Sequence, residues 1–114
     1  MILAELYLDE NNLLRYCRVE GHAKAGVKGN DVVCAAVSVL TKTIVLILSG
    51  REEISIRGSI PERGNFLMEV DYKPEGRDFL AGAGGFLLEG LLSVEKEFPS
   101  YCKVTIERRK FNGT

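Results

Sequence analysis

Residues 31–50 read DVVCAAVSVLTKTIVLILSG, and this stretch decides the fold. A helix drawn through it carries apolar side chains on nearly every side, which is typical of a helix covered by other parts of a protein. Asp31 is suited to cap the start of such a helix, and Gly50 is suited to follow its end. We therefore predict a helix that begins at Asn30 or Asp31 and ends at about Ser49.

A helix that is apolar all round needs cover on more than one face. In a chain of 114 residues one sheet covers one face, so a second helix or a second copy of the chain must cover the rest. We expect a homodimer with this helix near the interface. The interruption by Thr41-Lys42-Thr43 leaves the apolar run short of a convincing membrane span, and we expect no membrane association.

The segments on both sides of this helix alternate between apolar and polar residues, as strands do. The expected elements are strands over 2–8 and around 16–19 with a turn at 9–12, then a strand from Ile54, a turn at 61–65, a strand over 66–72, a helix over 78–98 and a strand over 102–109. The order ββαββαβ predicts a single α+β domain over residues 1–114, with two helices packed on a largely antiparallel sheet in two layers.

The composition is that of an ordinary globular protein, with 46% hydrophobic and 27% charged residues. Fifteen basic against sixteen acidic side chains give a net charge of −1, so electrostatics offers no reason to expect direct nucleic-acid binding. The amino-terminal segment lacks the basic region of a signal peptide, and a reducing cytoplasm is the expected compartment.

Three cysteines, at positions 17, 34 and 102, form neither a complete disulfide framework nor a Cys-x-x-Cys zinc pair. We therefore expect no metal and no cofactor. Cys17 and Cys102 fall on the inward faces of predicted strands and are expected to belong to the core.

Cys34 differs from these two because it lies near the predicted start of the helix, twelve residues after His22, the one histidine of the chain. A thiol becomes an effective nucleophile when it ionises, and a helix amino terminus or a neighbouring imidazole promotes that ionisation. Gly21, Gly26 and Gly29 predict a flexible loop that can bring the imidazole to the sulfur. The pattern favours a cysteine hydrolase, with Cys34 as nucleophile and His22 as base.

Two further side chains belong to this hypothesis. Ser38 follows Cys34 by four residues and therefore shares its helix face, where its hydroxyl can orient the sulfur or contact substrate. Asp31 can direct its charge at His22 or only cap the helix. A simpler interpretation also stands: on composition alone, a cysteine between two apolar residues is a small buried side chain, and a lone loop histidine lies at the surface.

The second predicted helix contains Gly82-Ala83-Gly84-Gly85. A glycine-rich turn at the start of a helix can bind phosphate, but this one lacks the spacing and the lysine of the known phosphate-binding motifs. The surrounding apolar stripe indicates instead that the glycines permit close packing.

The segment Gly21-His22-Ala23, followed by Gly29-x-Asp31-Val32-Val33-Cys34-Ala35-Ala36-Val37-Ser38-x-Leu40-Thr41, closely resembles the signature of the bacterial ribosomal-processing cysteine protease family, Prp. Glu97-Phe98-Pro99-x-Tyr101 supports the resemblance, which covers essentially the whole chain.

The resemblance implies a small α+β homodimer in which Cys34 and His22 form a catalytic dyad and Asp31 and Ser38 support it. It also implies the substrate: a large-subunit ribosomal protein, the twenty-seventh in the usual naming, which loses a short amino-terminal extension during ribosome assembly. Two alternatives stay open, a non-catalytic dimeric interaction module and a ribosome-associated RNA-binding factor.

Overall fold

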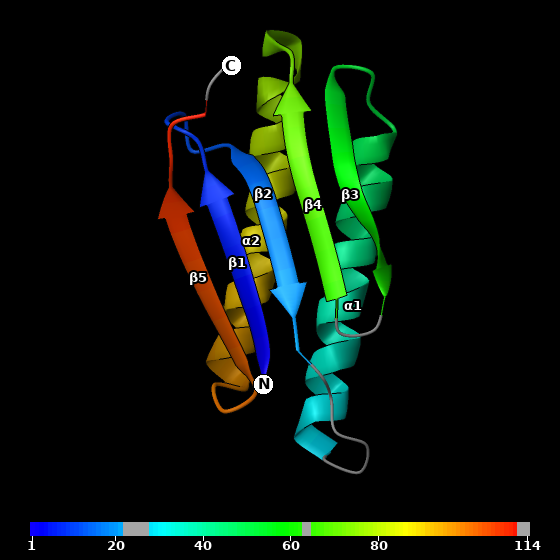
Figure 1. Ribbon diagram of the computed structural model, residues 1–114, viewed down its shortest axis with the longest axis vertical. Helices are drawn as coiled ribbons and strands as arrows, with labels where there is room; N and C mark the ends of the chain where they lie inside the picture. The colour runs from blue at the N-terminus through cyan, green and yellow to red at the C-terminus, as the bar shows by residue number, and fades with distance from the viewer. Residues whose placement is uncertain (22–27, 63–64, 112–114) are drawn as a thin grey trace.

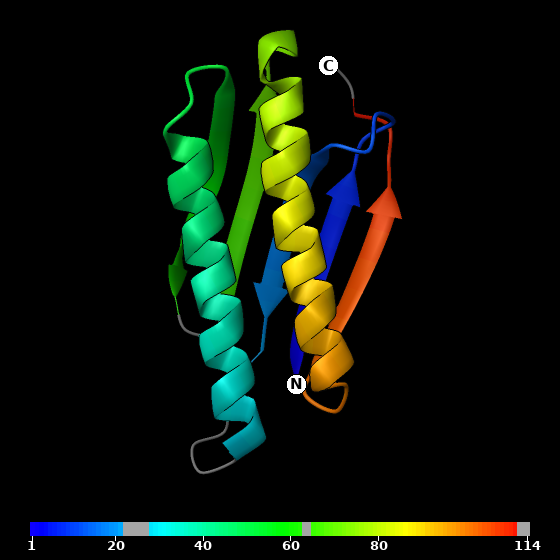
Figure 2. The ribbon, with the colours of Figure 1, turned by 180° about the vertical axis from the view of Figure 1, so that it is seen from behind.

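The computed structural model describes residues 1–21, 28–62 and 65–111, with the side chains of 28–31 and 59–62 left out of the description. Its elements are β1 (Ile2–Leu8), β2 (Leu14–Glu20), α1 (Lys28–Ser49), β3 (Ile54–Glu62), β4 (Asn65–Tyr72), a 3-10 turn (Pro74–Gly76), α2 (Arg77–Glu97) and β5 (Cys102–Arg108). Both helices lie on one face of a five-stranded sheet (Figures 1 and 2), which confirms the predicted α+β class and the order ββαββαβ.

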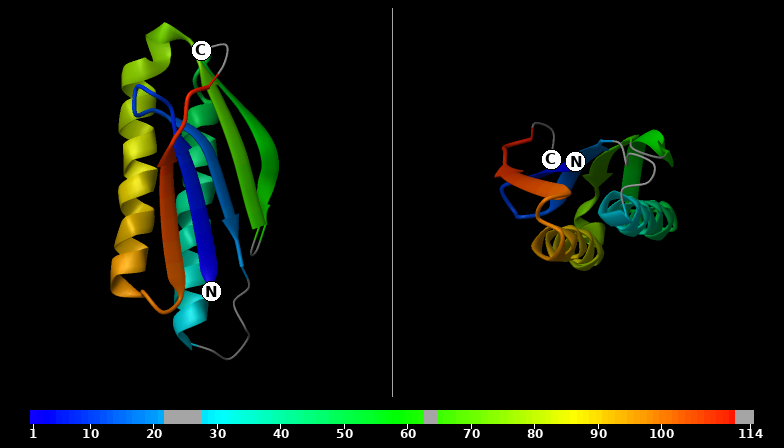
Figure 3. Two further views of the ribbon diagram at one scale, coloured as in Figure 1. Left: turned by 60° about the vertical axis from the view of Figure 1, so that its left-hand side comes forward. Right: turned by 90° about the horizontal axis from the view of Figure 1, so that it is seen from below.

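The strand order is β3-β4-β2-β1-β5. Three neighbouring pairs are antiparallel, and only β1 and β5 pair in parallel, so the prediction of a largely antiparallel sheet is confirmed. The successive strands β4 and β5 run in the same direction and therefore need a long crossover connection, which α2 provides and which brings β5 beside β1. Neither of the two described α-helices lies on the other face of the sheet (Figure 3).

The core forms where the inward side chains of the strands meet the two helices. Alternation along β1 turns Ile2, Ala4 and Leu6 toward the helices, because successive side chains of a strand point to opposite faces. Cys17 and Cys102 are buried in the same layer, as predicted. On α1 the buried apolar side chains are Val33, Cys34, Val37, Ile44 and Leu48, and on α2 they are Leu80, Leu87 and Leu91.

Two of the glycines in α2 permit close packing. A Cβ atom on Gly84 would lie 3.1 Å from Cβ of Leu14, and one on Gly90 would lie 2.8 Å from Cδ2 of Leu40. The close approach of α2 to β2 and to α1 therefore depends on these two positions. A Cβ on Gly82 or Gly85 would meet no atom within 4 Å, so packing inside one chain does not explain them.

The outer face of the helical layer is apolar and uncovered in a single chain. On α1, Val39 is 64% exposed and Leu46 is 75% exposed, and on α2 Phe86 is 63% exposed. Of the described helices, one contains a stretch, Val32–Ser49 with mean hydropathy 2.3, that is long and apolar enough to cross a membrane by length and composition. Its opposite face packs into the core, as the buried Ile44 and Leu48 show.

The start of α1 differs from the sequence prediction. The helix begins at Lys28, so Cys34 lies in its second turn and Gly29 lies in its first turn, where we had expected the loop. Glycine and asparagine are weak helix formers, but the first N–H groups of a helix need no acceptor within it, so such residues are tolerated there. The unpaired N–H groups of α1 consequently lie one turn before Cys34.

A buried polar cluster holds the other end of β1 and β2. The Asp9 carboxylate accepts hydrogen bonds from the Leu13 N–H at 3.1 Å and from the Tyr72 hydroxyl at 2.6 Å. The Arg15 guanidinium lies 3.6 Å from the Asp9 carboxylate and donates to Asp71 at 2.6 Å. These contacts join the β1–β2 turn to the end of β4.

Candidate functional site

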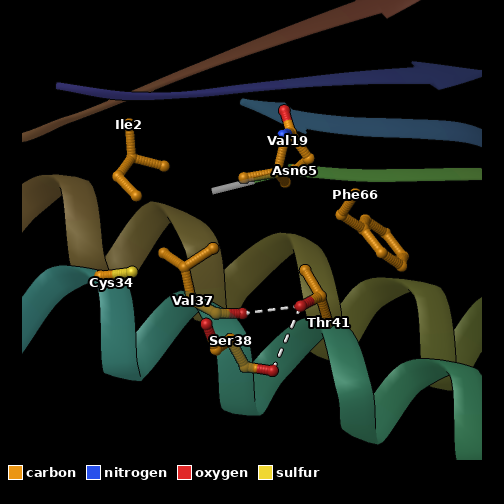
Figure 4. Close-up of a pocket in the computed structure, with 8 residues that line it drawn as sticks. All are labelled: Ile2, Val19, Cys34, Val37, Ser38, Thr41, Asn65 and Phe66. Atoms are coloured by element: carbon orange, nitrogen blue, oxygen red, sulfur yellow. Dashed lines mark hydrogen bonds between the residues drawn. The ribbon is translucent and has the colours of Figure 1, made fainter. Parts of the chain in front are cut away.

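A small cavity opens beside Cys34, at the end of the sheet where β1 begins and β2 ends (Figure 4). Its lining comes from Cys34, Val37, Ser38 and Thr41 on α1 and from Ile2, Val19, Asn65 and Phe66 on three strands. The volume is about 10 Å³, close to the space that holds a single water molecule. The cavity therefore gives access to the sulfur but has no room for a substrate side chain.

Cys34 is a free thiol that is 7% exposed. The core residues Val33 and Val37 fix the rotation of α1, and that rotation turns Cys34 toward the sheet beside them. The simpler interpretation, a small buried side chain, describes its burial correctly. It does not describe its position at the cavity.

The other two cysteines lie in different surroundings. Cys17 is fully buried between the sheet and the helices, and burial raises the pKa of its thiol to about 12. Burial also raises the pKa of Cys102, with a smaller contribution from the charge of Glu95. Both thiols therefore stay protonated, and so unreactive, near neutral pH.

Ser38 lines the same cavity as Cys34, as the four-residue spacing predicts. Thr41 lies one turn further along α1, where its hydroxyl is buried and reaches the carbonyl oxygens of Val37 at 3.0 Å and of Ser38 at 3.2 Å. The Thr41 hydroxyl thus belongs to the cavity wall and has its hydrogen-bond acceptors within α1. Its spacing of seven residues from Cys34 was a signal that the sequence reasoning missed.

The strand residues of the lining were also missed. Ile2, Val19 and Phe66 follow an alternating pattern that predicts buried positions, but that pattern says nothing about which buried residues meet Cys34. Their meeting depends on pairings between strands that are far apart in the sequence, such as Val19 with Phe66.

Three residues of the hypothesis are not fully placed. His22 and Gly26 lie outside the described residues, and Asp31 lies in the first turn of α1 with its side chain outside the description. Gly21, which is bonded to His22, is described: it follows the last residue of β2 and touches the backbone of Met1 and Ile2. Gly21, the last described residue before His22, therefore lies against Ile2, whose side chain lines the cavity.

The described lining contains no charged side chain. A thiolate in such surroundings needs a compensating cation, because an isolated charge loses hydration when it is buried. Such a cation would have to come from outside the described lining. Within the part of the chain that the structure describes, no three His, Cys, Asp or Glu side chains are grouped so as to hold a metal ion.

Sequence comparison assigns the chain to the cysteine proteases. A profile of the family described as cysteine protease Prp matches residues 1–103, so the chain belongs to the Prp family. No curated protein sequence gives a significant match.

Several solved structures share the fold. The Streptococcus mutans protein SMU.848 is 23% identical, with 96% of each chain covered and a TM-score of 0.78. The essential ribosomal processing protease Prp from S. aureus is 19% identical, with 93% of this chain and 99% of that chain covered. Its complex with a substrate peptide gives a TM-score of 0.77, and its complex with a covalently linked product peptide gives 0.75.

Proposed function

We propose that this protein is a cysteine endopeptidase that removes a short amino-terminal extension from the twenty-seventh protein of the large ribosomal subunit during ribosome assembly. The observation that carries the proposal is the position of Cys34 at a cavity in a chain of the Prp family. The capture of the similar S. aureus protease with a substrate peptide and with a covalently linked product peptide supports it. This substrate assigns the reaction to the cytoplasm.

The proposed mechanism is acyl transfer by a Cys34–His22 dyad. His22 accepts the thiol proton, and the thiolate attacks the scissile carbonyl carbon to give a tetrahedral intermediate. This intermediate collapses to a thioester as His22 returns the proton to the leaving amine. His22 then takes a proton from water, whose oxygen attacks the thioester and releases the extension as a carboxylic acid. Ser38 orients the sulfur from the next turn of α1, and Asp31 supports the imidazolium.

The closed cavity adds a requirement to this mechanism. A thiol that is 7% exposed at an opening of about 10 Å³ cannot reach the carbonyl of a bound peptide. Contacts around Cys34 must therefore open when the peptide binds and close again around the reacting atoms. Such closure excludes water until the thioester forms.

We propose that the protein works as a homodimer that covers the outer face of the helical layer. Val39, Leu46 and Phe86 form an exposed apolar face over both helices, and a second copy offers the same face to it. Gly82, which is exposed four residues before Phe86 and so shares its face of α2, supports this assignment. A glycine inside a helix costs about 1 kcal/mol relative to alanine, and contacts within one chain do not offset that cost.

The function is tested by incubating the purified protein with the extended ribosomal protein from the same genome and measuring intact masses. Cys34→Ala and His22→Ala are each expected to abolish the mass loss while circular dichroism and the melting temperature stay close to those of the wild type. Cys17→Ala is the matched cysteine control and is expected to retain cleavage, because Cys17 lies in the core away from the cavity. Wild-type turnover by either dyad variant would overturn the proposal.

A further inference from the structure

We propose that Gly21 is a positioning residue. It fixes the start of the segment that carries His22 against the strand end that also forms a wall of the Cys34 cavity. The inference rests on the proposed protease function and adds a residue whose task is to hold the two members of the dyad in register. It also differs from the sequence expectation, which makes Gly21 part of a flexible loop.

Two observations show that only glycine fits this position. The φ angle of Gly21 is +139°, a conformation that residues with a side chain rarely adopt. A Cβ atom there would also lie 2.3 Å from the carbonyl oxygen of Met1 and 3.0 Å from Cα of Ile2. Both neighbours are backbone atoms, so a change of rotamer cannot relieve the contact.

The surface under Gly21 is firmly held. The N–H of Ile2 donates to the carbonyl oxygen of Tyr101 at 2.8 Å, and Ile2 lies opposite Cys102 in the parallel pair of β1 and β5. On its other side β1 pairs with β2 up to Glu20, which lies opposite Leu3. The start of β1, against which Gly21 lies, is therefore held by hydrogen bonds to strands on both sides.

The same end of β1 reaches the nucleophile. The side chain of Ile2 is buried and lines the cavity together with Cys34 (Figure 4). The backbone of Ile2 thus supports the residue bonded to His22, while its side chain lines the same cavity as Cys34. The first residues of β1 therefore contact the residue before His22 and also form part of the cavity wall at Cys34.

A side chain at position 21 must therefore change the dyad. Relieving the contact from 2.3 Å to an allowed 3.0 Å requires a displacement of at least about 0.7 Å between Gly21 and Met1. His22 is the next residue, and its Cα follows across one rigid peptide unit. A misplacement of about 1 Å in a catalytic group can cost about 100-fold in rate.

The test compares Gly21→Ala with Gly58→Ala, a matched control. Gly58 has a φ of +145°, and a Cβ there would lie 1.9 Å from the carbonyl oxygen of Leu67, so the backbone conflict is of the same kind. Gly58 lies on β3, and neither Gly58 nor Leu67 lines the cavity. The measurements are kcat and KM for the extended ribosomal protein, the melting temperature, and the pH profile of Cys34 alkylation by iodoacetamide.

For Gly21→Ala we expect kcat to fall by about 10- to 100-fold with little change in KM, and the alkylation profile to approach that of His22→Ala. For Gly58→Ala we expect a lower melting temperature, with the kcat of the folded protein and the alkylation profile close to wild type. A folded Gly21→Ala with wild-type kcat, or an equal loss of kcat in Gly58→Ala, would overturn the inference.

A synthetic variant keeps the test decisive if Gly21→Ala does not fold. Ligation at Cys17 and Cys34 allows D-alanine to be placed at position 21. D-alanine favours positive φ and carries its methyl group on the side of Cα away from the Met1 carbonyl. Wild-type kcat in this variant supports the inference, and a loss of kcat in the folded variant overturns it.

Failure of the inference is distinguishable from failure of the proposed function. If the wild-type protein does not cleave the extended ribosomal protein, the function fails. If the wild type and a folded Gly21→Ala cleave it equally well, only the role of Gly21 fails.

Discussion

The three cysteines show how surroundings decide chemistry at the scale of single residues. Each is a buried free thiol, and a count of cysteines in the sequence does not separate them. Burial raises the pKa of both Cys17 and Cys102, and the charge of Glu95 adds a smaller effect at Cys102. Cys34 lines the cavity that Ile2 and Val19 wall, whereas Cys102 lies at a separate pocket with Met1 and Glu95.

This difference predicts selective labelling. Limiting iodoacetamide at neutral pH is expected to modify Cys34 well before Cys17 or Cys102 in the native protein, as peptide mass mapping shows. The reason is that the thiolate is the reactive form, that the other two thiols stay protonated, and that the proposed opening of the contacts around Cys34 admits the reagent there. In His22→Ala the labelling of Cys34 is expected to slow. Faster labelling of Cys102 than of Cys34 would contradict this assignment.

Asp9 provides a residue-scale prediction about pH. Burial alone raises its pKa, but the hydrogen bonds from Tyr72, Leu13 and Asn11 and the charge of Arg15 outweigh burial and lower it. The lowered pKa means that ionised Asp9 stabilises the fold above the pKa of the unfolded chain, and that this stability is lost as pH falls through the folded-state value.

Asp9→Asn is therefore expected to reduce the free energy of unfolding at neutral pH by about 1–3 kcal/mol, the cost of breaking a buried hydrogen-bonded network. It should also weaken the acid dependence of stability, measured by urea unfolding between about pH 3 and 7. Tyr72→Phe, which removes one hydrogen bond to Asp9, should shift the loss of stability to higher pH. If the free energy of unfolding of Asp9→Asn falls at acid pH as much as that of the wild type, this role of Asp9 is contradicted.

At the scale of elements, local sequence patterns predicted the presence and type of each element better than its boundaries. Alternation and helical periodicity placed every strand and both helices, and α2 and β5 lie within one residue of the predicted ends. The shared face of Cys34 and Ser38 followed from helical spacing. The start of α1 did not follow, because Gly29 and Asn30 are weak helix formers whose state is decided by surrounding contacts.

Alanine substitutions at two glycines of α2 are expected to change the stability of the subunit in opposite directions. Gly84→Ala is expected to lower stability by about 1–3 kcal/mol, because its Cβ meets the rigid Cβ of Leu14. Gly82→Ala is expected to stabilise the isolated subunit by about 1 kcal/mol yet weaken the dimer, because Gly82 shares the exposed face of Phe86 and the added methyl group meets the partner. Thermal unfolding at several protein concentrations separates the two effects. Unchanged association of Gly82→Ala would show that no partner packs there.

At the scale of the whole molecule, the site exists because distant segments meet at one end of the sheet. β1 begins there, β2 ends there, and the first turns of α1 extend past both (Figure 1). The sequence predicted the strands but not the order β3-β4-β2-β1-β5 or the parallel pairing of β1 with β5. A local sequence pattern does not indicate which of the distant segments pair with one another.

The dimer is also a property of the whole molecule. Leu46→Glu is expected to shift the protein toward a monomer in sedimentation equilibrium with little change in subunit stability, since Leu46 is 75% exposed in a single chain. Thr105→Glu, at an exposed position on β5 that points away from the helices, is the control and is expected to leave the mass unchanged. A wild-type protein with a monomer mass at every concentration would remove the dimer, and binding to lipid vesicles instead would assign the face to a membrane.

The central claim is that the sulfur of Cys34 carries the acyl group of the cleaved extension. The most direct measurement is acid quenching during turnover of the extended ribosomal protein, followed by intact mass and peptide mapping of the enzyme. We predict a transient mass increase equal to the extension minus one water, located on Cys34 and absent from Cys34→Ala, which leaves the substrate uncut. An adduct on another residue, or cleavage by Cys34→Ala at the wild-type rate, would contradict the account.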